Sequence, residues 1–170
     1  DIEYVRVKSF NPYTGSEAIY VVAKALVSEW FSPKAAELSL DDYKPGDKLI
    51  PFKVLDGMFK GSELVGIRYH QLIPWFKPLE GDAFRVISGD YVSIDEGTTG
   101  IVHIAPTFGA DDKKVAAAAG IPPMMVLDRN GNPQPQVDHD GRFCLLEDLD
   151  PEYVATHVAP EYKEYAGRFV

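Results

Sequence analysis

The sequence predicts an α+β domain in which a barrel-like, mostly antiparallel sheet is flanked by helices. Several short apolar stretches rich in β-branched residues alternate with turn signals, as in proteins built from short strands. Only a few segments space their apolar residues as helices do. The chain has 170 residues, of which 45% are hydrophobic, enough for one sizeable core. We therefore expect residues 1–170 to form a single domain.

The first third of the chain predicts a hairpin followed by helical segments. Apolar residues alternate on both sides of 11–15, an Asn-Pro-Tyr-Thr-Gly turn sequence. Apolar residues then recur at helical spacing, and Ser32 with Pro33 can begin a second helix. We expect strands at 2–10, 18–23 and 48–55, helical segments at 24–31 and 33–40, and a turn at 56–57.

The remainder predicts short strands around one well-bounded helix. Acidic residues favour the start of this helix, and Gly120 with Pro122 beyond it marks the end. Pro160 interrupts a later helical stretch. In order, we expect two short strands within 83–94, a buried strand at 100–106, the helix at 111–119, a strand at 124–127, a turn at 129–132, a loop at 133–140 and a partly helical segment at 148–169.

Residues 97–112 place a histidine near the end of the expected strand and two carboxylates at the start of the expected helix. Asp111 and Asp112 can simply favour the positive end of the helix, a contribution of about 0.3–1 kcal/mol. Alternatively, one of them holds a cationic group of a substrate, such as an α-ammonium. His103 is either a half-buried structural residue or a group that titrates, donates a hydrogen bond or shapes a pocket wall.

Composition excludes several classes of function. The formal net charge of -9 makes nucleic-acid binding by this chain alone weak. No apolar run approaches a membrane span and no signal-peptide pattern opens the chain, so we expect a cytoplasmic protein. The single cysteine, Cys144, excludes an intrachain disulfide and a cysteine-rich zinc site.

A metal site is the main alternative chemistry at this motif. His103 could combine with one of the two aspartates and with Asp138 or His139 as nitrogen and oxygen ligands. However, the sequence has no His-x-x-x-His or Cys-x-x-Cys spacing, so we expect no metal. A nucleophile elbow and a phosphate-cradling glycine loop are also absent from the sequence.

The unit Thr99-Gly-Ile-Val-His-Ile-Ala-Pro-Thr-Phe-Gly-Ala-Asp-Asp112 resembles a signature of class I aminoacyl-tRNA synthetases, and specifically of the editing domains of the isoleucyl-tRNA synthetase family. Further matches are Gly61-Ser-Glu-Leu-Val-Gly66 with Tyr69 and Pro74, and Tyr165-Ala-Gly-Arg-Phe-Val170. Together they extend the resemblance over nearly the whole chain. Phe108 stands where many bacterial members of the family have a second histidine.

The resemblance implies the editing-domain fold and post-transfer editing, the hydrolysis of valine misattached to the isoleucine tRNA. Isoleucyl enzymes are the usual example of why this is needed, because one methylene is worth only about 1–3 kcal/mol of discrimination. The resemblance implies that Asp112 binds the α-ammonium of the misattached amino acid, and that His103 lines the side-chain pocket and excludes isoleucine. The implied catalytic residues are Asp112 and His103, and the implied substrate-binding residues are Thr99, Gly100, Asp111 and Phe108.

The resemblance also implies partners and a missing part. The domain itself needs no cofactor, whereas the parent synthetase uses ATP and Mg. Its partners are the tRNA 3′ end carrying a misattached amino acid and the remainder of the synthetase, and we expect the fragment to be a monomer. The family's threonine-rich strand, which positions the terminal adenosine and the water, has no match here and would lie upstream of Asp1. We therefore expect a fragment that is truncated on its N-terminal side and is inactive alone.

Two alternative functions remain from the sequence. One is the editing domain of a valyl- or leucyl-tRNA synthetase, which matches the surroundings of His103 less well. The other is a non-catalytic, barrel-like interaction module in which the aspartate pair only stabilises a helix N-terminus.

Overall fold

A computed structural model describes all 170 residues and divides them into two compact units. Unit 1 consists of 1–67 and 86–103, and unit 2 consists of 68–85 and 104–170. Two small antiparallel sheets and three α-helices confirm the α+β class, but neither sheet closes into a barrel, so that part of the prediction is wrong. Whether 1–170 acts as one domain stays a prediction.

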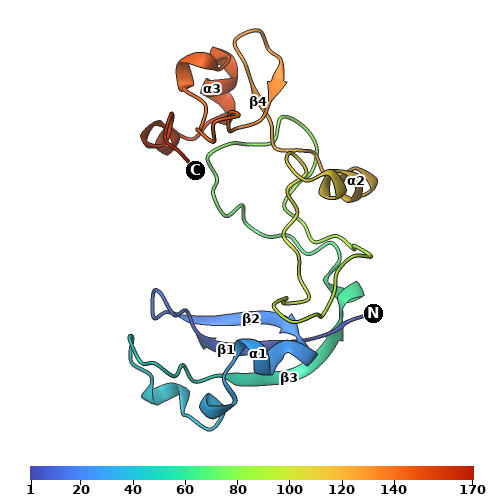
Figure 1. The fold of residues 1–170 in the computed structure, drawn as a ribbon, viewed down its shortest axis with the longest axis vertical. Helices are drawn as coiled ribbons and strands as arrows, with labels where there is room; N and C mark the ends of the chain where they lie inside the picture. Colours follow the sequence, from blue (N-terminus) through green and yellow to red (C-terminus); the bar gives the residue numbers. More distant parts are fainter. The chain divides into compact units, whose positions relative to one another are not determined.

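The sheet of unit 1 has three antiparallel strands in the order β2-β1-β3 (Figure 1). β1 spans Glu3–Phe10, β2 spans Glu17–Ala23 and β3 spans Lys53–Lys60. The Asn11 side chain accepts hydrogen bonds from the backbone N–H groups of Tyr13 and Thr14, which closes the turn between β1 and β2. The predicted hairpin is therefore confirmed.

The segment between β2 and β3 covers one face of this sheet with short helical turns. Leu26 and Ala35 from this segment are buried with Val5 and Val7 of β1. Helical structure is limited to a 3-10 turn at Lys24–Leu26, α1 at Val27–Trp30, and 3-10 turns at Pro33–Ala35 and Leu40–Asp42. The first predicted segment, 24–31, is helical over nearly its whole length, although it begins as a 3-10 turn. The second, 33–40, is shorter than predicted, because its helical turn ends at Ala35.

β3 begins five residues later than predicted, since the expected strand started at residue 48 and β3 starts at Lys53. The expected turn at 56–57 lies inside the strand as a β-bulge. Val5 pairs with Met58 and Val7 with Val54, so 55–57 together oppose Arg6 alone. Gly57 has a φ of 92°, which an L side chain rarely adopts, and glycine inside a strand commonly marks a bulge.

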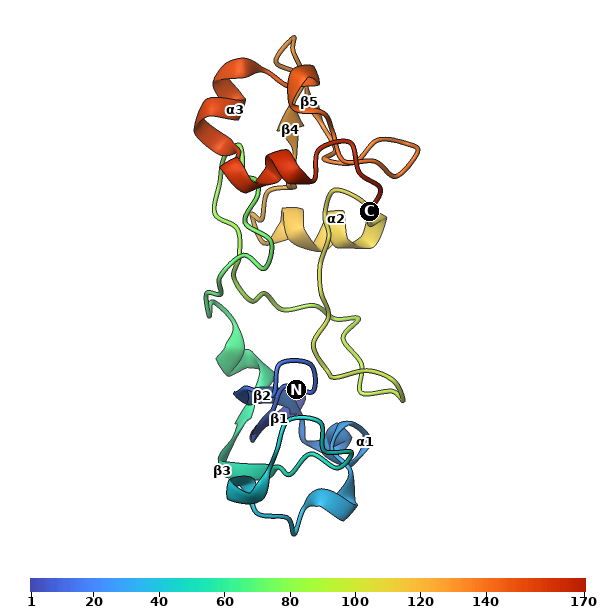
Figure 2. The same cartoon turned by 90° about the vertical axis from the view of Figure 1, so that its left-hand side faces the viewer.

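Unit 2 has a second core. It contains α2 at Ala110–Ala118, β4 at Val126–Leu127, β5 at Pro133–Gln134 and α3 at Pro151–His157. The core residues are Phe76, Val126, Leu149, Tyr153 and Tyr162, so α3 contributes to this core but α2 does not. α3 lies beside the β4–β5 hairpin, with the Asp150 N–H donating to the Leu127 carbonyl at 3.0 Å (Figure 2).

These elements confirm most of the predictions for residues 111–169. α2 and the strand at 124–127 are present, although the strand is shortened to β4, and the expected loop at 133–140 begins as β5. The backbone at Val158 and Ala159 is extended, which confirms the break near Pro160. None of the helices is long and apolar enough to cross a membrane.

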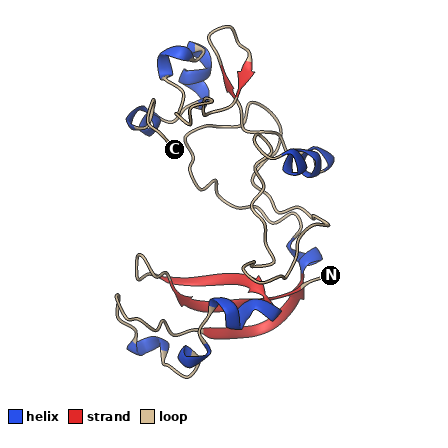
Figure 3. Ribbon diagram, viewed as in Figure 1, coloured by secondary structure: helices blue, strands red, loops and turns tan.

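Residues 65–109 contain no helix and no named strand (Figure 3). The predicted strands within 83–94 and at 100–106 are therefore wrong. A β-branched segment becomes a strand only where a neighbouring strand offers a ladder of hydrogen bonds, and none pairs with 100–106. Ile101 and Val102 are accordingly 47% and 44% exposed instead of buried.

The turn between β4 and β5 is organised by Asp128. Its carboxylate accepts hydrogen bonds from the backbone N–H groups of Asn130 and Asn132, at 2.8 and 2.9 Å, and from the Asn132 side chain. The backbone hydrogen bond from Asn132, followed by the bond from its side chain, holds the pKa of the Asp128 carboxyl below its ordinary value.

This pKa predicts a specific dependence of stability on pH. A carboxyl whose pKa is lowered on folding stabilises the fold fully above its unfolded pKa of about 3.9. That contribution is lost as the pH falls through the lower folded pKa. We expect Asp128→Asn, which cannot titrate, to be less stable than the wild type at pH 6, with a difference that shrinks below about pH 4. Denaturant unfolding at several pH values measures it.

Asp140→Asn is the matched control, because Asp140 lies inside a similar turn, which Asp138 organises, and the Asp140 carboxylate itself makes no hydrogen bond or ion pair. The difference in the free energy of unfolding between Asp140→Asn and the wild type should not shrink in this way as the pH falls. A difference for Asp128→Asn that stays constant from pH 6 to pH 2 contradicts the assignment.

Candidate functional site

The predicted pocket wall at Thr99 and Gly100 is attached to the first hairpin of unit 1. The Thr99 carbonyl accepts a hydrogen bond from the Ala23 N–H at 3.0 Å, and the Gly100 carbonyl accepts one from the Tyr4 hydroxyl. Burial raises the pKa of the Tyr4 hydroxyl, which keeps it a neutral donor. These contacts hold the backbone of the wall against β1 and β2.

Gly100 fits this position because it has no side chain. Its φ of 75° lies in the left-handed region, and a Cβ there would lie 2.7 Å from the Cβ of Ala23. The close approach of 99–100 to β2 therefore requires glycine. The Thr99 hydroxyl is used locally, because it bonds to the backbone of Ile101.

In unit 2, Asp112 lies in the first turn of α2 and bends back towards the preceding segment. Its Oδ2 accepts a hydrogen bond from the Ala105 N–H at 2.9 Å. The Ala105 carbonyl accepts from the N–H groups of Phe108 and Gly109, each at 3.0 Å, so the turn before the helix is closed from both sides. Asp112 does not cap its own helix, whose N-cap is Gly109 without a side-chain bond.

The Asp112 carboxylate can accept further hydrogen bonds. An ionised carboxylate has about four lone-pair positions, and the chain supplies one donor, a backbone N–H. No lysine, arginine or histidine forms an ion pair with it. The side chain is half-buried at the positive end of a helix, where a negative charge is favoured. This arrangement can bind a small cation with an N–H donor.

The other predicted site residues are more exposed. Asp111 has a side chain that is 88% exposed and pairs with Lys114 at 3.3 Å, as on a solvated helix face. Phe108 is 65% exposed. His103 lies on an exposed loop and not on a strand, and it makes no hydrogen bond in the structure. His103 belongs to unit 1 and Asp112 to unit 2, so their roles in one site stay predictions.

The Arg85 side chain, which is not among the predicted site residues, holds the other end of α2. Arg85 Nη2 donates to the Ala119 carbonyl at 2.5 Å, at the negative end of the helix. Asp82 lies 3.6 Å from Arg85 and binds Arg68 through two hydrogen bonds of 2.6 and 2.7 Å. The hydrogen bond from Arg68 holds the pKa of Asp82 below its ordinary value. The i,i+3 spacing of Asp82 and Arg85 was the only available sequence signal.

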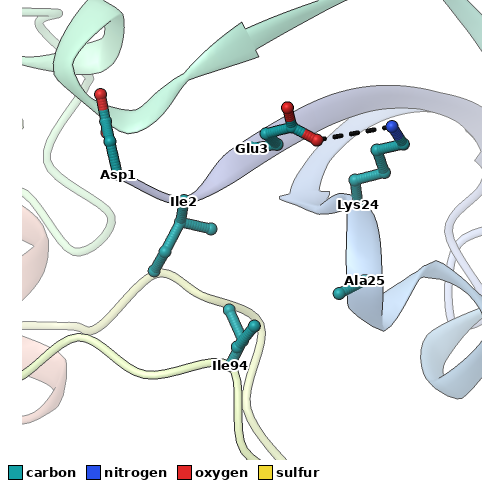
Figure 4. A pocket seen from close by; sticks show the side chains of 6 residues that line it. All are labelled: Asp1, Ile2, Glu3, Lys24, Ala25 and Ile94. Atoms are coloured by element: carbon teal, nitrogen blue, oxygen red, sulfur yellow. Dashed lines mark hydrogen bonds and ion pairs between the residues drawn. The ribbon is translucent and has the colours of Figure 1, made fainter.

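Unit 1 also contains a shallow hollow, which no predicted site residue lines (Figure 4). It has a volume of about 550 Å³ and lies in unit 1 between Ile2, Ala25 and Ile94. Its charged side chains are already paired, Glu3 with Lys24 and Asp1 with Ser62. No group of three His, Cys, Asp or Glu side chains in the chain could hold a metal ion.

Comparison with known proteins found close relatives, although no family model matches the chain. The chain is 58% identical to the isoleucine–tRNA ligase of Bacteroides fragilis over 170 residues, which are 99% of this chain. Identity is 54% over 166 residues with that of Cytophaga hutchinsonii and 51% over 172 residues with that of Porphyromonas gingivalis. The chain spans only 15% of the length of each of these relatives.

The geometry at Gly100 predicts that this position tolerates no side chain. We expect Gly100→Ala to lower the free energy of unfolding, first through the left-handed backbone at about 1–2 kcal/mol. The contact with Ala23 adds a further cost of about 1–3 kcal/mol, as overpacking usually does. Denaturant unfolding of both proteins measures the loss.

Gly97→Ala separates the two effects. Gly97 also has a positive φ, of 83°, but a Cβ there meets no atom within 4 Å. It should therefore show only the backbone cost. Equal losses for the two variants would rule out the close approach to Ala23.

Proposed function

The chain belongs to the isoleucine–tRNA ligase family, of which it matches one segment, and we propose that this segment hydrolyses the ester joining valine to the isoleucine tRNA. Water is the nucleophile, and the products are valine and the free tRNA 3′ end. The ligase reaction that uses ATP and Mg belongs to other parts of such an enzyme. We assign no cofactor to the hydrolytic step.

The observation that carries this proposal is the incompletely used carboxylate of Asp112. It is half-buried, ionisable and free of any cationic partner in the chain, with a single backbone N–H bound at 2.9 Å. The α-ammonium of an aminoacyl ester is a small cation with several N–H donors, and it complements such a group. A hydrogen bond between two charged groups is stronger than one between neutral groups, so Asp112 orients the ester for attack.

Selection by size is the second part of the proposal. A pocket that accepts isoleucine cannot reject valine well, since one methylene contributes only about 1–3 kcal/mol, and the isoleucyl enzymes are the usual example. A hydrolytic pocket that excludes the larger side chain removes the valyl product. We assign the backbone of Thr99 and Gly100 to the wall of this pocket, and His103 to the exclusion of isoleucine. Asp111 and Phe108 take supporting contacts with the substrate.

The charge of the chain limits how the tRNA binds. A net charge of -9 repels a phosphate backbone, so this segment recognises the aminoacylated end and contributes little to the affinity for the tRNA as a whole. The phosphate contacts come from the remainder of the synthetase, which is therefore a required partner.

Replacing the charge of Asp112 tests the assignment. Asp112→Asn keeps an oxygen that can accept the Ala105 N–H, so the turn before α2 is retained while the negative charge is lost. A hydrogen bond to a charged group is worth about 1.5–3 kcal/mol. We therefore expect kcat/KM for the deacylation of valyl-tRNA by the full-length protein to fall roughly ten- to a hundredfold. Isoleucine activation should be unchanged.

Glu152→Gln is the control, because Glu152 is the acidic residue in the first turn of α3 and its loss removes an equivalent helix-terminal charge. Its rate of deacylation should match the wild type. Unchanged deacylation in Asp112→Asn would show that the carboxylate is only a favourable helix-terminal charge.

A further inference from the structure

Two side chains at the end of α1 hold the segment directly before the predicted pocket wall. The Gly97 N–H donates to Glu29 Oε1 at 2.5 Å, and Trp30 Nε1 donates to the Thr98 carbonyl at 2.6 Å. Glu29 and Trp30 are adjacent in sequence and lie 68 residues before their partners. All four residues belong to unit 1.

These bonds complete an unbroken series along 97–100. Each residue of this segment carries one hydrogen bond to an early element of unit 1, in order to Glu29, Trp30, Ala23 and Tyr4. We call these four bonds the 97–100 clamp. The turn that the clamp holds is closed internally, because the Thr98 hydroxyl and N–H both donate to the Asp95 carbonyl, at 2.7 and 3.1 Å.

Packing in the hydrophobic core does not explain the two bonds of the clamp that Glu29 and Trp30 make. Trp30 is 51% exposed and does not belong to the buried core of unit 1. The one hydrogen bond of its indole goes to Thr98. Glu29 is exposed, and its carboxylate forms no ion pair. The hydrogen bonds of both side chains therefore hold one backbone segment, 97–98, in place.

We propose that Glu29 and Trp30 are positioning residues that fix the wall at Thr99 and Gly100 and so set how strictly the site rejects the larger amino acid. This inference rests on the proposed hydrolytic function. A wall made of backbone cannot adjust by changing side-chain rotamers, so its distance from the substrate depends on its anchors. A loosened wall admits isoleucine as well as valine, which lowers discrimination more than it lowers the rate with valine.

The test removes single donors in the full-length protein. Trp30→Phe keeps an aromatic ring and deletes only the indole N–H. Loss of one hydrogen bond changes such an equilibrium about two- to tenfold. We expect the ratio of valyl-tRNA to isoleucyl-tRNA deacylation, each measured as kcat/KM, to fall by that factor, mainly through faster hydrolysis of the isoleucyl ester. A merely structural role would lower both rates together and leave their ratio unchanged.

Three further variants show whether a change in the ratio comes from the lost hydrogen bond to the 97–100 segment. Trp75→Phe makes the same change at the other tryptophan of the chain, whose indole N–H makes no hydrogen bond, and should leave the ratio unchanged. Glu29→Ala should lower the ratio as Trp30→Phe does. Glu29→Gln, which keeps an oxygen for the Gly97 N–H, should restore it at least in part. If Trp30→Phe does not fold, the Glu29 pair provides the same comparison.

Hydrogen exchange of the Trp30 indole N–H, followed by NMR, tests the clamp without activity. We expect slow exchange in the wild type despite the exposed ring, and faster exchange in Glu29→Ala. If the wild type does not hydrolyse valyl-tRNA, the proposed function fails while this measurement still decides on the clamp. If the wild type discriminates and Trp30→Phe discriminates equally well, the positioning role is overturned.

Discussion

The hydrogen bond from the Ala105 N–H to the Asp112 carboxylate ties the start of α2 to the segment before it. Because this bond uses one of about four lone-pair positions, the carboxylate is fixed in place without being neutralised. α2 is held at its other end by Arg85 and by Gly120, whose N–H and that of Ile121 bond to carbonyls of the last turn. A charge on a helix anchored at both ends is suited to hold a substrate cation.

In unit 1, hydrogen bonds fix an uncharged backbone segment, residues 97–100, in place. The predicted pocket wall at Thr99 and Gly100 consists of backbone, and the first hairpin and α1 supply the donors and the acceptor that hold this segment. Gly100 allows the close approach, since any larger residue would meet Ala23. Within unit 1, the side-chain bonds that hold residues 97–100 join segments far apart in sequence, whereas the bond between Ala105 and Asp112 in unit 2 joins residues seven positions apart. Thr99, Gly100 and Asp112 do not belong to a hydrophobic core.

The sequence correctly predicted turns and helix ends, which depend on residues close together in the chain. The turn after Asn11, the end of α2 before Gly120 and the break near Pro160 each depend on residues close together in the sequence, and all three are confirmed. The strands expected within 83–94 and at 100–106 were wrong because a strand depends on a neighbour that the sequence does not reveal. The family resemblance drew attention to Asp112, but it did not predict the bond of this residue to Ala105, seven positions earlier. The contacts of Arg85 with Ala119 and of Trp30 with Thr98 join residues 34 and 68 positions apart, and the sequence did not predict either of them.

NMR with a non-hydrolysable valyl-adenosine analogue measures whether Asp112 binds the α-ammonium of a misattached amino acid. Saturable binding to the full-length protein should shift the backbone amide resonances of Ala105 and Asp112, because a cation on the carboxylate weakens its bond to the Ala105 N–H. The same titration of Asp112→Asn should leave both resonances in place. Saturable binding that moves neither resonance in the wild type, or moves both equally in Asp112→Asn, would show that the carboxylate does not hold the α-ammonium.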